Sequence, residues 1–229
     1  LKKVTRNPFL SFFLGAGITI AIQSSSAMTV MLVGLVNSGI VDFCDTFGVV
    51  MGSNVGTTLT AWLLSLAGIG GDNFFLTLLK PMTFAPLLAF IGILFRMISK
   101  EEKKKNIGLI FIGFAILMTG MDFMSNSMNS VQEMKGFQSL LTAFRSPIVA
   151  LLISILFTGI IQSSAATIGI VQALALTGAI TYEMAIPLVL GANIGTCITA
   201  FLSSFGTNKN AKRVVALHIY VNVLGSVVC

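Results

Sequence analysis

The sequence predicts an all-α membrane protein with two inverted-topology repeats, each built from a re-entrant helical hairpin and an interrupted transmembrane helix. Composition, an internal duplication and the distribution of charge lead to this prediction. Of the 229 residues, 55% are hydrophobic and only 10% are charged, and the mean hydropathy is +0.94. Soluble domains contain about 25% charged residues, so most of this chain is expected to lie in a bilayer.

The duplication is visible in the polar residues. A shift of 139 positions aligns residues 8–67 with residues 147–206 without a gap, and 18 of the 60 aligned pairs are identical. The identical pairs include Gln23 with Gln162 and Asn54 with Asn193, which a shared apolar composition would not produce. These segments define repeat one (8–67) and repeat two (147–206).

Each repeat opens with an apolar segment that has a polar centre, Gln23–Ser26 in repeat one and Gln162–Ser164 in repeat two. The helix before the first centre, residues 8–22, would be about 22 Å long, whereas a hydrocarbon core is about 30 Å thick. We therefore expect two re-entrant hairpins whose polar tips meet near the midplane and line a cavity.

Farther along each repeat, glycines flank an asparagine inside a long apolar helix. The two segments are Gly52–Thr58 and Gly191–Cys197. Such glycines weaken a helix, so we expect interruptions near the midplane at Asn54 and at Asn193. Glycines four residues apart also permit close packing of helices, and the two roles are compatible.

The remaining segments complete a single transmembrane transport domain over residues 1–229. Connecting helices are expected at 74–128, an interfacial amphipathic segment on the outer face at 129–146, and a last helix at 211–229. The chain starts with Leu1 and ends inside an apolar run, so we expect a fragment whose last helix is truncated.

Crossing parity and loop charge agree on the topology. Three full crossings, an odd number, separate the two hairpins, so the repeats are expected to be inverted; the crossings are Phe47–Ile69, Phe74–Ile98 and Ile107–Met128. Eleven of the 14 Lys and Arg residues fall on one predicted face, including the cluster Lys100–Lys105. The positive-inside rule makes that face cytoplasmic.

Inverted repeats with opposed hairpins are typical of secondary transporters, whose sites lie at the repeat interface. A duplicated channel or scaffold is the alternative. The basic residues form short clusters rather than one basic face, which disfavours nucleic-acid binding. The cysteines lack metal-ligand spacing, and His218 has no carboxylate close in sequence, so no enzyme is predicted.

The two hairpin tips form the candidate anion site. Serine hydroxyls and glutamine amides donate hydrogen bonds, and a helix that starts at a tip presents free N–H groups and the positive end of its dipole. Such groups suit phosphate. For one cluster, joining helices in lipid would be the better interpretation, but two clusters at equivalent positions favour binding. The candidate phosphate ligands are Gln23, Ser24, Ser25, Ser26, Gln162, Ser163 and Ser164.

The interrupted helices form the candidate sodium site. Free backbone carbonyls, together with Asn and Thr oxygens, are suitable ligands for sodium. Neither motif contains Arg, Lys, Asp or Glu, so bound sodium would offset the charge of the anion. The candidate sodium ligands are Asn54, Thr57, Thr58, Asn193 and Thr196.

Together, the motifs Gln23–Ala27, Gly52–Thr58, Gln162–Ala165 and Gly191–Thr196 closely resemble the type II sodium–phosphate cotransporter family. The resemblance covers essentially the whole chain. It implies secondary transport of inorganic phosphate, driven by the sodium gradient through alternating access. It also implies that the paired glutamine–serine motifs bind both ions, which adds Gln23 and Gln162 to the candidate sodium ligands.

We expect a bacterial member of this family, located in the inner (plasma) membrane with its basic loops in the cytoplasm. The expected partners are inorganic phosphate, sodium and the lipid bilayer. No nucleic acid is expected, and a homodimer is possible. Sodium is expected as the coupling ion, with no cofactor and no other metal. The alternatives are a carrier for another oxyanion or a dicarboxylate, an anion channel, and a phosphate sensor.

Overall fold

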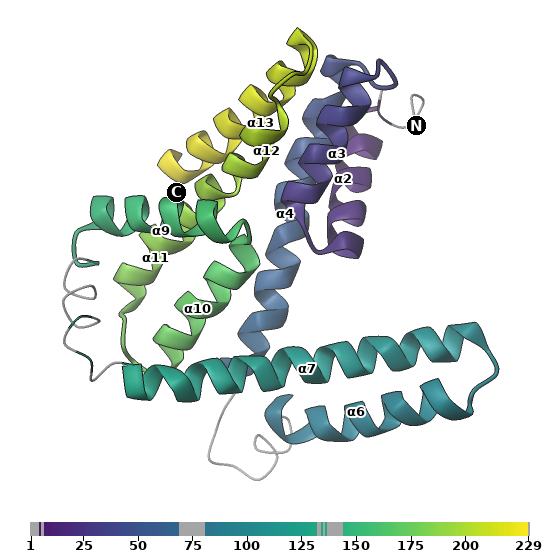
Figure 1. Cartoon of the computed structure of the whole chain (residues 1–229), viewed down its shortest axis with the longest axis vertical. Helices are drawn as coiled ribbons and strands as arrows, with labels where there is room; N and C mark the ends of the chain where they lie inside the picture. Colours follow the sequence, from purple (N-terminus) through teal and green to yellow (C-terminus); the bar gives the residue numbers. More distant parts are fainter. Residues whose placement is uncertain are drawn as a thin grey trace. The chain divides into compact units, whose positions relative to one another are not determined.

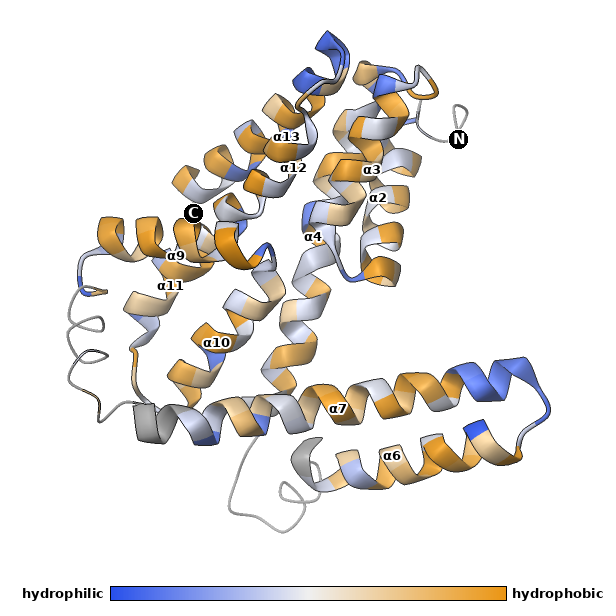
Figure 2. Cartoon of the chain, viewed as in Figure 1, coloured by the Kyte–Doolittle hydropathy of each residue, from blue (hydrophilic) through white to orange (hydrophobic). Residues whose placement is uncertain are grey.

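All the regular secondary structure in the computed structural model is helical over the residues it describes, which are 5, 7–68, 81–131, 134, 136 and 144–228 (Figure 1). Four helical stretches are long and apolar enough to cross a membrane: Phe43–Ser65, Glu102–Ser127, Tyr182–Ser203 and Lys209–Val228. Apolar residues cover most of the helical surface, and polar residues gather at helix ends and turns (Figure 2). The expected all-α membrane protein is confirmed in these terms.

The chain forms two compact units. The first unit contains most of both repeats and the last helix: Leu1–Ala61, Leu140–Val171 and Thr181–Cys229. The second contains Trp62–Ser139 and Gln172–Ile180. The single transport domain over 1–229 stays a prediction.

The two repeats share the structure of their hairpins. In repeat one, α2 (Pro8–Ile22), α3 (Ser25–Asn37) and α4 (Thr46–Ser65) follow one another, with short 3₁₀ turns at Phe43–Asp45 and Leu66–Gly68. In repeat two, the order is α9 (Pro147–Ile161), α10 (Ser164–Leu176), α11 (Tyr182–Gly195) and α12 (Cys197–Ser203). The shift that aligns the sequences also aligns the bounds of α2 with α9 and of α3 with α10. Both α2 and α9 begin at a proline, which is favourable at the first helical position.

Glycines on α4 and α11 bring these helices against α2 and α9. A Cβ atom at Gly56 would lie 2.8 Å from the carbonyl oxygen of Ala16, and one at Gly195 would lie 2.7 Å from that of Ile155. Ala16 and Ile155 are themselves equivalent positions, so the two repeats use the same helix contact. At Gly52 an added Cβ would overlap the carbonyl oxygen of Phe12. These glycines therefore serve close packing.

This packing explains why one expectation about the interrupted helices is wrong. Helix α4 runs without a break from Thr46 to Ser65, through Asn54. In repeat two, α11 ends at Gly195 and α12 begins at Cys197, so the interruption lies beyond Asn193. The glycines weaken a helix in principle, but their close contacts with α2 and α9 favour helical backbone around Asn54 and Asn193 alike.

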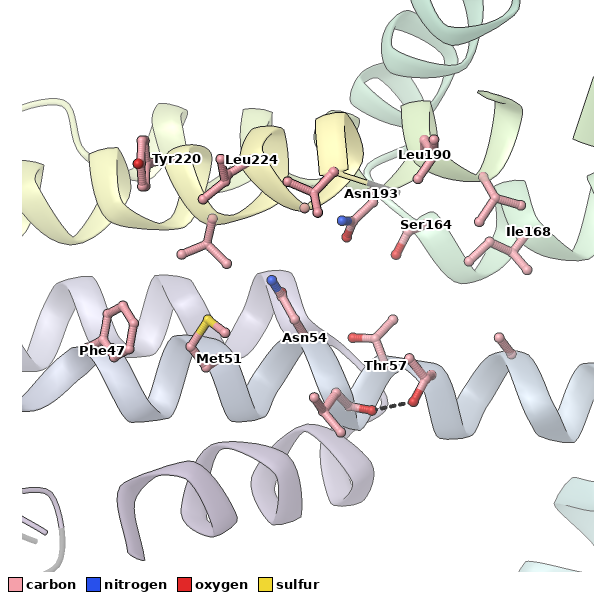
Figure 3. Close-up of a pocket in the computed structure, with 17 residues that line it drawn as sticks. Phe47, Met51, Asn54, Thr57, Ser164, Ile168, Leu190, Asn193, Tyr220 and Leu224 are labelled. Carbon is pink, nitrogen blue, oxygen red and sulfur yellow. Dashed lines mark hydrogen bonds between the residues drawn. The ribbon is translucent and has the colours of Figure 1, made fainter. Parts of the chain in front are cut away.

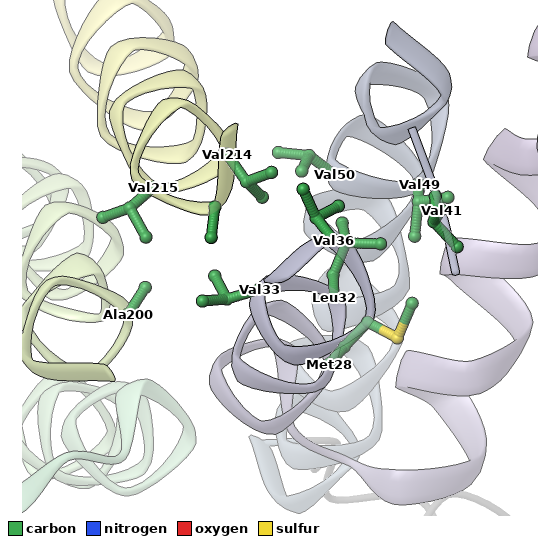
Figure 4. Close-up of a cluster of buried hydrophobic side chains, with 11 residues drawn as sticks. Met28, Leu32, Val33, Val36, Val41, Val49, Val50, Ala200, Val214 and Val215 are labelled. Atoms are coloured by element: carbon green, nitrogen blue, oxygen red, sulfur yellow. The ribbon is translucent and has the colours of Figure 1, made fainter. Parts of the chain in front are cut away.

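A buried apolar cluster joins the repeats inside the first unit (Figure 4). Helix α3 of repeat one contacts α12 of repeat two and the last helix, α13 (Lys209–Val228). The cluster contains Met28, Leu32, Val33, Val36, Val41, Val49, Val50, Ala200, Ala211, Val214 and Val215. Helix α13 covers the described residues of the last helix expected at 211–229.

The second unit contains α6 (Pro81–Ile98) and α7 (Glu102–Val131), which run side by side in opposite directions (Figure 1). Of the connecting helices predicted at 74–128, residues 74–80 lie outside the described residues. Helix α7 extends past the predicted span at both ends, and most of the interfacial segment predicted at 129–146 also lies outside the described residues. The re-entrant geometry, the inversion and the cytoplasmic face stay predictions.

Candidate functional site

Each polar tip is a tight turn between two helices. In repeat one, the backbone N–H of Gln23 donates to the carbonyl of Thr19 and ends α2. The hydroxyl of Ser24 then accepts a hydrogen bond of 3.1 Å from the N–H of Ala27 and so caps the start of α3. In repeat two, the backbone N–H of Gln162 donates to the carbonyl of Thr158 and ends α9 in the same way. There, the hydroxyl of Ser163 accepts the N–H of Ala166 at 3.2 Å. Each turn therefore ends one helix and starts the next within two residues.

The glutamines permit this turn by adopting a backbone conformation that side chains rarely take. Gln23 has φ 58° and Gln162 has φ 59°, and no other non-glycine residue in the described part of the chain has positive φ. The left-handed region costs about 1–3 kcal/mol for such residues, and strain of this kind is often found at functional sites. Sequence reasoning missed this feature, although the shared Gln-Ser-Ser motif is a signal that could have pointed to it.

The two tips line one pocket of about 120 Å³. All seven candidate phosphate ligands contribute to it, together with Ala165 and two threonines of α4, Thr57 and Thr60. One water needs about 10–15 Å³ of such volume, so the pocket has room for several waters. A small tetrahedral oxyanion, which takes the place of several waters, therefore fits. Helices α3 and α10 both start at this pocket, so two sets of free N–H groups lie at its wall.

The side chains in the pocket differ in the hydrogen bonds they already make. The Gln23 side chain donates to the carbonyl of Ile20 at 2.7 Å and accepts from the hydroxyl of Thr60 at 2.6 Å. Within the described chain, the side chain of Gln162 makes no such bond, and the buried hydroxyl of Thr199, the counterpart of Thr60, has no partner. The tip of repeat two therefore has more unused hydrogen-bonding capacity than that of repeat one.

Three serine hydroxyls also stay unused. The hydroxyls of Ser25, Ser26 and Ser164 make no hydrogen bond to another residue of the described chain, whereas the hydroxyls of Ser24 and Ser163 cap helices. Ser25 and Ser26 are buried, at 7% and 8% exposed. Hydroxyls of pocket-lining residues that lack a protein partner are suited to bind a ligand.

A second cavity, of about 680 Å³, lies beside the first and contains most of the candidate sodium ligands (Figure 3). Asn54, Thr57, Thr58 and Asn193 line it, while apolar side chains form most of the remaining wall. Thr57 and Ser164 line both cavities.

The candidate sodium ligands are not all equally placed. Thr196 lines neither cavity and donates to the Ala192 carbonyl at 3.0 Å. The hydroxyls of Thr57 and Thr58 donate to carbonyls of their own helix, Ser53 and Val55. Asn54 and Asn193 come from equivalent positions of the two repeats and lie at the same cavity.

Helix α13 contributes polar residues that sequence reasoning did not assign to the site. Asn222 is 0% exposed and accepts a hydrogen bond of 2.7 Å from the side chain of Asn54. His218, one turn earlier, is 1% exposed, and neither ring nitrogen has a hydrogen-bond partner in the described chain. An asparagine inside an apolar span is itself a signal, because polar residues at membrane depth are costly.

Comparisons with known proteins give one matching family and several similar proteins. A model of the family described as Na+/Pi-cotransporter matches the chain twice, over residues 1–126 and 116–227. The uncharacterized protein YqeW of Bacillus subtilis is 31% identical over 222 residues, which are 96% of this chain and 68% of YqeW. No solved structure matches the chain.

Two further relatives carry functional names. The Salmonella typhimurium protein named "Putative inorganic phosphate export protein YjbB" is 28% identical over 228 residues, which are 99% of this chain but 39% of YjbB. Sodium-dependent phosphate transport protein 2C of Mus musculus is 42% identical over 59 residues, 26% of this chain and 10% of that protein.

Proposed function

Because the chain belongs to the Na+/Pi-cotransporter family, we propose that it moves inorganic phosphate across a membrane, coupled to sodium and by alternating access. One observation carries the proposal: equivalent tips of the two repeats line a single neutral pocket at which two helices begin. The sodium-dependent phosphate transport protein of mouse, which is similar to part of the chain, supports the same function.

Phosphate is bound in this pocket by neutral donors. Ser25, Ser26, Ser164 and Gln162 line it, and α3 and α10 begin at it, so their hydroxyls, amide and uncapped first N–H groups are the donors. Each helix N-terminus favours a nearby anion by about 0.3–1 kcal/mol, and by up to about 2 kcal/mol where it is partly buried. Two such termini therefore offset part of the desolvation of the anion without a buried arginine or lysine.

Sodium occupies the larger cavity, where asparagine and threonine oxygens are available. Its charge offsets that of the phosphate, because the residues lining both cavities are neutral. A wall shared through Thr57 and Ser164 brings the two ions close enough to interact. Gln23 and Gln162 line only the phosphate pocket, so they bind sodium only if the ion approaches the wall formed by Thr57 and Ser164.

Alternating access requires the tips to move with the helices that contact them. The close glycine contacts join α2 to α4 and α9 to α11, so each pair moves as one body. Opening one pair relative to the other exposes the pocket to one side of the membrane at a time, as in other transporters with repeats.

Export is the second candidate direction, favoured by the name of YjbB. A carrier for another oxyanion or a dicarboxylate, an anion channel and a phosphate sensor remain the alternative functions. Phosphate flux distinguishes these alternatives from the proposal, because only a sodium-coupled phosphate carrier gives saturable phosphate movement that follows the sodium gradient.

The deciding experiment measures radioactive phosphate movement in proteoliposomes that contain the purified chain. Sodium gradients of either direction are compared with a choline gradient of equal ionic strength, and sulfate and a dicarboxylate serve as competitors. Saturable phosphate flux that follows sodium supports the proposal. Flux that is indifferent to sodium, or that sulfate abolishes at equal concentration, contradicts it.

A further inference from the structure

Asn222 connects the candidate sodium ligand Asn54 to a buried thiol. The side-chain nitrogen of Asn54 donates to the Asn222 oxygen at 2.7 Å, and the Asn222 nitrogen donates to the sulfur of Cys197 at 3.0 Å. The three residues come from α4, α13 and α12, all within the first unit. Asn222 and Cys197 are buried, at 0% and 4% exposed.

The hydrogen bonds of this chain run in one direction, from Asn54 through Asn222 and Cys197 to the backbone of His218. The thiol of Cys197 lies 3.9 Å from the backbone carbonyl oxygen of His218, which can only accept. In the structure the thiol hydrogen points to that carbonyl, and the sulfur accepts from the amide nitrogen of Asn222. An amide that donates through its nitrogen here must present its oxygen to Asn54, so Asn54 must donate.

The consequence concerns the other half of the Asn54 amide. With its nitrogen turned toward α13, as Figure 3 shows, Asn54 keeps its carbonyl oxygen free of a protein partner at the cavity of about 680 Å³. A carbonyl oxygen is a hard ligand that suits sodium, whereas an amide N–H group in its place would repel a cation.

We infer that Asn222 and Cys197 are positioning residues, which fix the Asn54 amide with its oxygen toward the cavity as a ligand for sodium. The inference rests on the proposed function and names a residue for its cation site. It gives α13, which lies outside both repeats, a part in sodium affinity.

Repeat two provides an internal comparison. Asn193, the counterpart of Asn54, makes no side-chain hydrogen bond within the described chain, so no neighbour fixes its amide. Thr58, the counterpart of Cys197, turns its hydroxyl back to the Val55 carbonyl at 2.6 Å. The directed chain of hydrogen bonds therefore orients Asn54 and has no counterpart at Asn193, and sodium affinity should depend on it more than on Asn193.

Three variants test the direction of the chain. Asn222→Leu removes the amide oxygen and nitrogen while the side chain keeps a similar volume. Cys197→Ala removes the thiol, which is both a donor and an acceptor. Cys197→Ser keeps a donor and an acceptor in the smaller hydroxyl group. Asn210→Leu is the matched control, since Asn210 is an exposed asparagine on the same helix. Loss of a group that orients a metal ligand typically weakens metal affinity by about 10–100-fold.

The half-saturating sodium concentration is measured in two ways. One is phosphate flux in proteoliposomes; the other is the rise in melting temperature of the purified protein with sodium, relative to choline. We expect Asn222→Leu to raise the half-saturating sodium concentration about tenfold and Cys197→Ala to raise it less. Cys197→Ser and Asn210→Leu should match wild type, and the half-saturating phosphate concentration at saturating sodium should stay constant in all variants.

The outcomes separate this inference from the proposed function. Wild-type sodium affinity in both Asn222→Leu and Cys197→Ala overturns the inference, as does an equal loss in Cys197→Ala and Cys197→Ser, which would indicate packing alone. If Asn222→Leu does not fold, the two Cys197 variants decide. Sodium-dependent melting without phosphate flux refutes the proposed function and still tests the inference, whereas a wild-type protein that sodium does not stabilise refutes the inference.

Discussion

Replacing Ser25 or Ser164 by alanine tests the phosphate pocket directly. Both hydroxyls lie at the pocket wall, each on the first residue of its helix. Neither is bonded to another side chain or carbonyl in the described chain, so alanine leaves no protein group without its partner. The measured loss should therefore come from the bond to phosphate.

The expected magnitude follows from that bond. A hydrogen bond to a charged group contributes about 1.5–3 kcal/mol, and each 1.4 kcal/mol is about tenfold in affinity. Phosphate affinity should fall about 10–100-fold in each variant. Ser24→Ala should behave differently, because loss of an N-cap costs about 0.5–2 kcal/mol of stability, and its melting temperature should fall as well.

Binding isotherms for purified protein, recorded at saturating sodium, provide the measurement. Ser38→Ala is the control: Ser38 is exposed, donates to the carbonyl of Leu35 and lies outside both cavities. Wild-type phosphate affinity in both Ser25→Ala and Ser164→Ala would refute the assignment, and the tips would then be packing elements only.

The other predictions concern backbone strain, packing and topology. Gln162→Gly should leave the melting temperature nearly unchanged, since relief of a left-handed residue offsets the flexibility of glycine, while phosphate affinity falls; a large loss of stability would contradict this. Gly52→Ala should destabilise the protein because the new methyl overlaps α2, whereas Gly34→Ala, with nothing within 4 Å, should be neutral or stabilising by about 0.4–1 kcal/mol; equal melting temperatures would show that the contact is absent. Cysteines replacing Lys103 and Arg145 should react with impermeant reagents from the cytoplasm and from outside respectively, and labelling of both from one side would rule out the inverted arrangement.

The helix bounds could be predicted from the sequence where local chemistry determines them. Pro8 and Pro147 mark helix starts, and the polar Gln-Ser-Ser motifs mark turns, so the helix expected over residues 8–22 has the bounds of α2, Pro8–Ile22. The convergence of both tips on one pocket also follows from the duplication, because equivalent residues in two packed repeats tend to meet.

Features that depend on neighbours were harder to predict. Gly52 and Gly56 are compatible with unwinding and with close packing, and only the contact with α2 decides for packing. The partner of Asn54 lies 168 positions away, at Asn222, and belongs to neither repeat. Self-similarity cannot reveal a contact that one repeat makes with a helix outside both.

The two cavities share a wall, which ties the two binding equilibria together. A ligand that moves Thr57 or Ser164 in one cavity alters the other, since both residues line both cavities. Linkage then makes the effect reciprocal: the factor by which sodium raises phosphate affinity equals the factor by which phosphate raises sodium affinity. Substituting valine for Thr57, which keeps the shape but removes the hydroxyl, should lower both factors by the same amount.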